Sequence, residues 1–432
     1  YVQRQGSSAS FLERDDGKEG IVHTASLLQS PDRLRLNWPQ FRRELELKRE
    51  TVDQAAAFFP RLPGTTYAYA APPQLNDGWP TSRARNSGFD EAALAALVKS
   101  IAESDPAGRQ PSFIHSLLIA RRGKLVLEEY FFGHGRNTLH DLRSAGKTFS
   151  SMMLGAVMSQ GANLTPDTPI APLLSARGPF ANAAPSKDRI TLAHLMTHTS
   201  GLACNDNDEN SPGNEERLQT QQAEKDYWKY TLDLPVLHEP GTRYAYCSAG
   251  MNLMGGALTT ATNKWLPELF DRTIARPLQF GLYAWNLSPN EEGYLGGGAR
   301  LRPRDLLKIG QVYLNGGTWQ RRRIVSSDWV ETSTAPRVTI DEATTGLSKE
   351  ELGNFYAPGG ADALAWHTYE IKVGDRTVKE YEASGNGGQL LIVVPELDLA
   401  VVLTGGNYGQ GGIWGRWRDQ IVGGAIIPAI VK

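Results

Sequence analysis

Ser144 and Lys147 are the residues whose types and spacing most directly suggest chemistry. They lie three positions apart in the segment HDLRSAGKTFS. On a helix they would share one face, so the lysine amine could contact the serine hydroxyl. A serine in the first helical turn also faces the positive end of the helix dipole, which favours negative charge on its oxygen. The pair therefore suggests a nucleophile with a base beside it, although a Ser-x-x-Lys pair is expected about once by chance in a chain this long.

Two further polar segments follow downstream. Tyr246 and Ser248 lie two residues apart in a turn that leads into an apolar helical pattern. Ser384, Gly385 and Asn386 stand where one expected strand ends and the next begins. Small residues at a strand end let a substrate lie along the strand edge. In chain order the sequence thus offers Ser-x-x-Lys, Tyr-x-Ser and a Ser-Gly strand end.

This ordered set resembles the penicillin-recognising serine hydrolases, the beta-lactamase-related family of class C beta-lactamases, D-alanyl-D-alanine carboxypeptidases and carboxylesterases. Residues 189–202 resemble the family's helix-and-turn signature. Residues 296–317 resemble its Gly-rich turn entering a helix, with Pro303 suited to a first helical position. Five motifs in the family's order make the resemblance specific, and it covers roughly residues 88–432.

The resemblance assigns a role to each motif. Ser144 would be the acylating nucleophile, and Lys147 and Tyr246 would share the proton transfers as a coupled pair. Which of the two is the general base is left open. Ser248 would touch both the lysine and the substrate. The backbone N–H groups of Ser144 and Asn386 would form the oxyanion hole.

The third motif departs from the family pattern. Ser384 and Gly385 match the substrate-binding strand, but the preceding position, where the family usually has Lys or His, is Ala383. The cation that helps to hold a substrate carboxylate is missing there, which favours an ester or a neutral amide. His367 or an arginine from elsewhere could replace it.

Cys204 and Cys247 are the two cysteines of the chain. Because the resemblance brings both near the catalytic cleft, we expect a disulfide between them, with two buried free thiols as the alternative. A disulfide would favour an oxidising compartment. The chain begins at Tyr1 rather than Met, so we expect that it has been trimmed, by signal-peptide removal or at a cloning boundary. We therefore expect a periplasmic or secreted protein.

The elements that must position these residues follow from hydrophobic periodicity. The sequence predicts a helix over 89–104, a hairpin of 113–120 with 125–132, mostly helix over 144–315, strands over 366–404 with a hairpin of 390–394 and 399–404, and a last helix over 413–431. Strands near both ends suggest one antiparallel sheet flanked by helices, with a helical subdomain inserted at about 150–300. The predicted class is α+β.

The first 87 residues are expected to form an N-terminal arm or extension that wraps the main domain, residues 88–432. Their periodicity is weak, and Pro and Gly recur at 72–80. One helix is predicted around 38–59, where Phe41, Leu45, Leu47 and Val52 fall near a helical stripe.

The composition argues against several classes of binding partner. A net charge of −2 without a basic stripe argues against nucleic acid and anionic membrane, and no apolar run is long enough for a membrane span. His194 and His198 lack the Glu of the zinc motif, and the acidic stretch 205–210 lacks the spacing of a calcium loop, so it is expected to be solvated. We expect no metal and no cofactor, while an oligomer is left open.

The sequence thus predicts a serine hydrolase that works through an acyl-enzyme on small esters or amides, with weak beta-lactam hydrolysis as a side activity. A true beta-lactamase or D-alanyl-D-alanine carboxypeptidase is the alternative among enzymes. A non-catalytic binding or sensor protein on the same fold is the alternative from another class.

Overall fold

The computed structural model describes residues 2–13, 21–28, 32–39, 42–49, 51 and 56–431. The chain divides into two units, Tyr1–Phe58 and Phe59–Lys432. Residues 59–87, the second part of the expected arm, therefore belong to the larger unit.

The smaller unit is a five-stranded antiparallel meander in the order β1-β2-β3-β4-β5. Its strands are β1 (Val2–Gln5), β2 (Ser8–Glu13), β3 (Ile21–Leu27), β4 (Arg33–Trp38) and β5 (Arg43–Lys48), and a short 3-10 helix, η2 (Ala56–Phe58), closes the unit.

The helix predicted over 38–59 is wrong in its described part. Leu45 and Leu47 lie on β5, where each pairs with a leucine of β4. Residues two apart share one face of a strand, and β5 alternates polar and apolar residues, which is the pattern of a half-exposed strand. Phe41 and Val52, on which the helix prediction also relied, lie outside the described residues.

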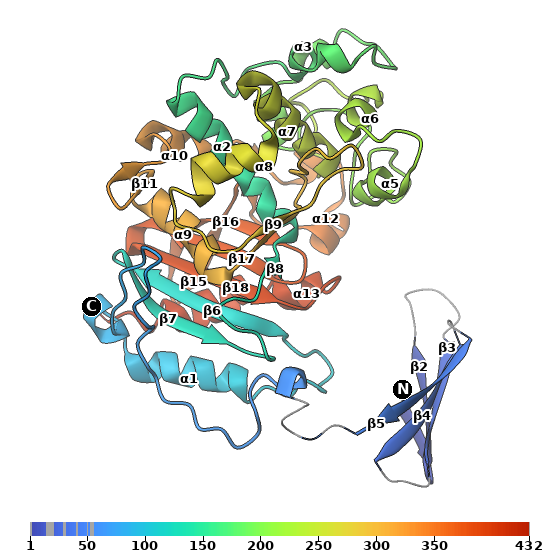
Figure 1. Cartoon of the computed structure of the whole chain (residues 1–432), viewed down its shortest axis with the longest axis vertical. Coiled ribbons are helices and arrows are strands. Elements are labelled where there is room, and N and C mark those ends of the chain that lie inside the picture. Colours follow the sequence, from blue (N-terminus) through green and yellow to red (C-terminus); the bar gives the residue numbers. More distant parts are fainter. Residues whose placement is uncertain are drawn as a thin grey trace. The chain divides into compact units, whose positions relative to one another are not determined.

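The larger unit is built on an eight-stranded antiparallel sheet in the order β13-β14-β15-β16-β17-β18-β6-β7 (Figure 1). These strands are β6 (Ile114–Arg121), β7 (Lys124–Tyr130), β13 (Val338–Thr339), β14 (Ala361–Asp362), β15 (His367–Val373), β16 (Arg376–Gly385), β17 (Gln389–Val394) and β18 (Leu399–Gly405). Because β18 pairs with β6, the sheet joins both ends of the domain, as predicted. Both predicted hairpins are confirmed.

The central strands are buried on both faces. On β18, Leu399, Val401 and Leu403 pack into one core cluster, together with α1 and the C-terminal helix. Ala400 and Val402 pack into the other cluster, with the helices of the opposite layer. A strand that is covered on both faces has a continuous run of apolar residues in its sequence. Figure 1 shows α1 beneath β6 and β7, and α2, α7 and α8 on the other side.

Helices dominate between the two groups of strands, as predicted, and the α+β class is confirmed. The α-helices are α1 (Glu91–Ala102), α2 (Thr148–Ser159), α3 (Ile170–Leu173), α4 (Leu192–Met196), α5 (Glu215–Thr220), α6 (Tyr227–Asp233), α7 (Ser248–Thr262), α8 (Leu266–Phe270), α9 (Pro303–Leu314), α10 (Ser327–Thr334), α11 (Glu342–Thr345), α12 (Lys349–Phe355) and α13 (Gly411–Trp414). The predicted last helix is split into α13 and the π-helix η9 (Arg418–Ile426), and a second π-helix is η7 (Asp271–Ala275).

Short elements complete the larger unit. They are the 3-10 helices η3 (Ala84–Ser87), η4 (Arg143–Lys147), η5 (Ser175–Arg177), η6 (Lys187–Arg189) and η8 (Pro395–Leu397), and the strands β8 (His140–Asp141), β9 (Ala284–Trp285), β10 (Ala299–Leu301), β11 (Thr318–Trp319) and β12 (Arg322–Arg323). The small sheet β8-β10-β9 joins the segment before Ser144 to the Gly-rich turn.

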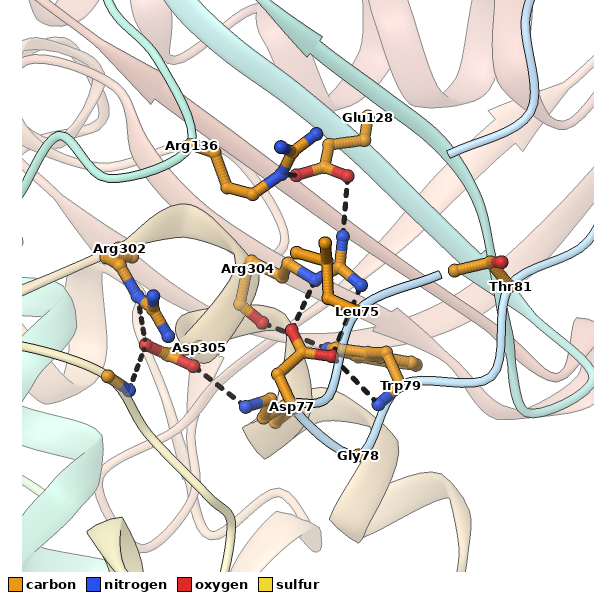
Figure 2. A network of polar contacts seen from close by, with 12 residues as sticks. Leu75, Asp77, Gly78, Trp79, Thr81, Glu128, Arg136, Arg302, Arg304 and Asp305 are labelled. Carbon is orange, nitrogen blue, oxygen red and sulfur yellow. Dashed lines mark hydrogen bonds and ion pairs between the residues drawn. The ribbon is translucent and has the colours of Figure 1, made fainter. Parts of the chain in front are cut away.

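A buried ion-pair network ties the Pro-rich segment 72–81 to α9 and β7. Figure 2 shows Arg304 between Asp77 and Glu128, with Trp79 alongside. Arg304 Nε donates to Asp77 at 2.5 Å, and Arg304 Nη1 donates to Glu128 at 2.7 Å. Trp79 is fully buried, and its indole N–H donates to the Arg304 carbonyl at 3.1 Å. Segment 72–81 is thus fixed to the domain by charge as well as by packing.

Candidate active site

Ser144 lies in η4, a 3-10 helix that leads directly into α2. Side chains at i and i+3 eclipse in a 3-10 helix, so Lys147 stands over Ser144, and its Nζ lies 3.0 Å from Ser144 Oγ. Lys147 is buried, and its Nζ also donates to the carbonyl of Gly296. The residue before the serine, Arg143, has a φ of +49°. Left-handed backbone at a non-glycine residue is strained, and such strain clusters at functional sites.

The Gly-rich turn packs against this serine turn. Gly297 has a φ of +142°, and a Cβ there would lie 2.7 Å from the carbonyl oxygen of Arg143. Leu142 N donates to the Ala299 carbonyl at 3.0 Å, which holds the two segments together. Only glycine allows the turn to approach closely enough for the Gly296 carbonyl to reach Lys147.

His198 fixes the Tyr-x-Ser turn from both sides. Its Nδ1 accepts the N–H of Cys247 at 3.1 Å, and its backbone carbonyl accepts the N–H of Ala245 at 2.9 Å. Its ring packs on that of Tyr246, with centroids 4.4 Å apart. Burial lowers the pKa of His198 to about 3, so the ring is neutral. The hydrogen bonds of His198 therefore hold this turn, while His194 forms a capping box with Thr191 at the start of α4.

The predicted disulfide between Cys204 and Cys247 is confirmed. It links the loop after the helix-and-turn signature to the residue that follows Tyr246, with the two Cα atoms 5.4 Å apart. Cys247 is also the N-cap of α7 and accepts the N–H of Gly250. The residue next to Tyr246 is therefore tied covalently to the loop that begins at Cys204.

Two carboxylates of the helical layer influence Lys147. Asp206 accepts the N–H of Ser248 at 2.8 Å and that of Glu215 at 2.9 Å. Burial lowers the pKa of Lys147, but Tyr246 raises it, and so do Glu215 and Asp206. The net shift is upward, so Lys147 is an ammonium at neutral pH. The acidic stretch 205–210 is thus not simply a solvated loop, because Asp206 faces the site.

Tyr246 also holds its proton at neutral pH. Burial raises its pKa, and the Lys147 charge and hydrogen bonding with Ser144 and Lys147 lower it by less. The Lys147 ammonium lies 5.0 Å from the centre of the Tyr246 ring. Lys147 and Tyr246 therefore form one coupled titrating pair, and the pair must lose a proton before it can accept the one on Ser144.

The raised pKa values predict an alkaline activity profile. We expect kcat/KM, which reports the free enzyme, to rise with pH between 7 and 9, because deprotonation of the pair creates the base. Asp206→Asn removes a negative charge beside Lys147 and should move this rise to lower pH. Asp208→Asn, an exposed carboxylate of the same loop, is the matched control and should leave the profile unchanged. A profile that is flat from pH 6 to 9 would contradict this assignment.

The end of β16 lies against the serine turn. A Cβ on Gly385 would lie 2.2 Å from the Leu142 carbonyl and 3.2 Å from Ser144 N, so this position admits only glycine. Ser384 lines the same small pocket as Ser144 and Lys147. Asn386 follows the strand, is exposed, and its side chain accepts the N–H of Gly409 at 2.8 Å.

The structure therefore brings the three sequence motifs together. Ser248 lies at the start of α7 and is fully buried. Its hydroxyl has no hydrogen-bond partner among the described residues, so the contact with Lys147 that the resemblance implies is not among the hydrogen bonds of the site.

The pocket also contains a histidine–carboxylate pair, His367 and Asp362, of which the sequence analysis named only the histidine. His367 Nδ1 is 2.5 Å from Asp362 Oδ1, and both residues line the pocket together with Ala383. Burial lowers the pKa of His367, but Asp362 raises it by more, so the net shift is upward. The His367 imidazole thus lines the same pocket as Ala383, the position where the family has its cation, and it is paired with a carboxylate.

Arg418 cannot supply that cation. It is buried, and its guanidinium binds Glu382 through two hydrogen bonds of 2.9 and 2.6 Å. Glu380 lies 3.3 Å from the same guanidinium. The Arg418 guanidinium is therefore fully engaged by its neighbours.

The beta-lactamase family model matches residues 115–410. The chain belongs to the beta-lactamase family, whose members are in general serine hydrolases.

Individual relatives are distant. Over 291 residues the chain is 26% identical to the D-alanyl-D-alanine-carboxypeptidase/endopeptidase AmpH of Escherichia coli K12, covering 61% of this chain and 70% of that protein. The fold of this chain is similar to that of EstCE1, a hydrolase with promiscuous acyltransferase activity. The two chains are 16% identical with a TM-score of 0.59, and the match covers 79% of this chain and 99% of EstCE1. The octameric penicillin-binding protein homologue from Pyrococcus abyssi gives 17% identity and a TM-score of 0.53, with 75% of each chain covered.

Among the described residues, no helix is both long enough and apolar enough to cross a membrane.

Proposed function

We propose that this chain is a serine hydrolase that is acylated on Ser144 and acts on small esters or neutral amides. The observation that carries the proposal is the 3.0 Å approach of Lys147 Nζ to Ser144 Oγ. The buried position of the lysine and the packing of three motifs around the serine support it.

The proposed mechanism has two halves. Ser144 Oγ attacks the substrate carbonyl carbon while its proton passes to the deprotonated Lys147–Tyr246 pair. The N–H groups of Ser144 and Asn386 receive the developing oxyanion. The pair then protonates the departing alcohol or amine, and a water molecule, deprotonated by the same pair, releases the acid from Ser144.

The preference for esters rests on the missing cation. Ala383 replaces the family's Lys or His, and Arg418 is engaged by Glu382. The His367 imidazole is paired with Asp362. A substrate carboxylate would therefore find no unpaired cation among these groups, and burying it unpaired is costly.

A D-alanyl-D-alanine carboxypeptidase is the second candidate, because AmpH covers 61% of the chain. The esterase and the carboxypeptidase can be distinguished by the substrates that they hydrolyse fastest. We expect kcat/KM for p-nitrophenyl acetate or butyrate to exceed that for nitrocefin by at least about tenfold, which corresponds to about 1.4 kcal/mol of transition-state binding. A peptide ending in D-Ala-D-Ala should be cleaved still more slowly than nitrocefin.

Three results would change the assignment. Nitrocefin turnover equal to ester turnover would favour a beta-lactamase, and efficient release of D-alanine would favour the carboxypeptidase. No turnover of any of these substrates, with no labelling by a fluorophosphonate, would favour a binding protein on the same fold.

We further propose that the protein resides in the periplasm or is secreted. The Cys204–Cys247 disulfide supports this, because disulfides persist in oxidising compartments.

A further inference from the structure

Three histidines from separate segments meet at the edge of the main sheet. His115 lies on β6, His134 lies in the turn after β7, and His140 lies on β8. Each presents a ring nitrogen, and these three nitrogens all lie within 4.8 Å of one another. The rings of His115 and His134 are stacked with centroids 4.0 Å apart, and that of His140 lies 4.8 Å from His134.

Two of these rings carry a buried nitrogen without a partner. His115 Nδ1 and His140 Nε2 have no hydrogen-bond partner among the described residues. Buried polar atoms nearly always have a hydrogen-bond partner. Two buried ring nitrogens without one in the same cluster therefore indicate that a ligand binds there. Burial, with smaller contributions from the neighbouring rings, lowers the pKa of His115 to about 3 and that of His140 to about 4. A neutral imidazole keeps a lone pair on one ring nitrogen, which is the atom that binds a metal ion.

We propose that His115, His134 and His140 bind one divalent transition-metal ion, and specifically Zn²⁺. Neutral imidazole is a preferred ligand of zinc, with Zn–N distances of about 2.0–2.1 Å. In a tetrahedral site such ligands stand about 3.3 Å apart. The three nitrogens already lie within 4.8 Å of one another. The His115 and His134 rings are stacked and nearly parallel, so they must turn out of the stack for both lone pairs to face one ion. A water molecule would take the fourth position.

The surroundings fit a bound ion. His140 is buried, whereas His115 and His134 are partly exposed, which leaves the ion a path from solvent. A Cβ on Gly406 would lie 2.7 Å from the His115 ring, so the backbone of the 405–409 loop closes one side. Oxygen-preferring Ca²⁺ and Mg²⁺ are not expected to bind, because the three ligand groups are all nitrogen.

A bound ion would stabilise the folded protein and would take no part in the acylation of Ser144. The ion would tie β6, the turn after β7 and β8 together, and His140 on β8 lies four residues before Ser144. Binding to the folded state alone stabilises it by mass action. The proposal is thus independent of the proposed hydrolase activity, and either can fail without the other.

The test is a titration of chelator-treated protein, produced without a histidine tag, with Zn²⁺ by calorimetry. We expect one equivalent to bind and the Tm to rise on binding. His134→Gln should weaken zinc binding on the order of 100-fold by removing one of three ligands and should abolish the rise in Tm. His238→Gln, an exposed histidine outside the cluster, is the matched control and should bind zinc like the wild type.

A cobalt spectrum of the wild-type protein keeps the test decisive even if His134→Gln does not fold. One equivalent of Co²⁺ in a site with three imidazoles and one water should give the intense visible bands of tetrahedral cobalt, and Zn²⁺ should displace them. Weak octahedral bands, no binding, or equal zinc affinity in wild type and His134→Gln would overturn the proposal and leave a packed cluster of neutral rings.

Discussion

Lys147→Met should lower kcat/KM on p-nitrophenyl butyrate by about 10³-fold or more, within the range that loss of a general base produces. The substitution removes the amine that stands 3.0 Å from Ser144 Oγ and keeps an unbranched apolar side chain of similar length. The measurement is steady-state kinetics together with circular dichroism, which shows that the variant is folded.

A buried lysine elsewhere provides the matched control. Lys187 is 3% exposed, and its Nζ donates to the carbonyls of Ala181 and Leu232. Lys187→Met also removes a buried ammonium, but it should leave kcat/KM of the folded protein within about twofold of wild type, because it does not contact the site. If Lys147→Met kept more than a tenth of the activity, the amine would not be the proton acceptor.

Arg304→Met should lower the free energy of unfolding by about 3–5 kcal/mol, because Asp77 is left uncompensated and the buried Glu128 keeps only Arg136 as an ion-pair partner. Arg304 is 1% exposed, and the side chain of Glu128, which lies between Arg304 and Arg136 in Figure 2, is fully buried. Asp77 would lose its guanidinium partner at the same time. Chemical denaturation monitored by tryptophan fluorescence measures the change.

An exposed ion pair supplies the comparison. Arg189 and Glu239 are paired with side chains 57% and 61% exposed, and Arg189→Met should cost less than about 1 kcal/mol. In a double variant, Glu128→Gln should recover part of the loss caused by Arg304→Met, because a neutral amide tolerates burial better than a charge. A loss below about 1 kcal/mol for Arg304→Met would show that Asp77 and Glu128 are satisfied without it.

The sequence was most informative where the signals are local. The strands β17 and β18 are continuous apolar runs on either side of a turn, so their hairpin could be predicted without knowledge of their neighbours. Ser144 and Lys147 were found for the same reason, because three residues of one helical turn bring them together. The resemblance then supplied the disulfide, which spacing alone could not.

The first unit shows why a helical stripe can mislead. Leu45 and Leu47 fit both a loose helical pattern and a strand, and the two-residue interval between them is the strand period. In a short amphipathic segment the choice depends on whether neighbouring strands are present to pair with it, as β4 is here.

The charged groups that act on Lys147 could be identified only from the structure. Asp206 and Glu215 reach Lys147 from a loop and a helix that follow it by about 60–70 residues, so no spacing rule connects them. The same is true of His115, His134 and His140, which occupy three different elements. His194 and His198 carried a closer likeness to a zinc motif, yet both are used in hydrogen bonds that hold turns.

The most direct test of the central claim is to identify the acylated residue. Wild-type protein is treated with a fluorophosphonate, its mass is measured intact, and the modified peptide is sequenced. We predict one adduct per chain, located on Ser144, absent from Ser144→Ala and formed in parallel with loss of ester hydrolysis. An adduct on another residue, or ester turnover that persists in Ser144→Ala, would contradict the account.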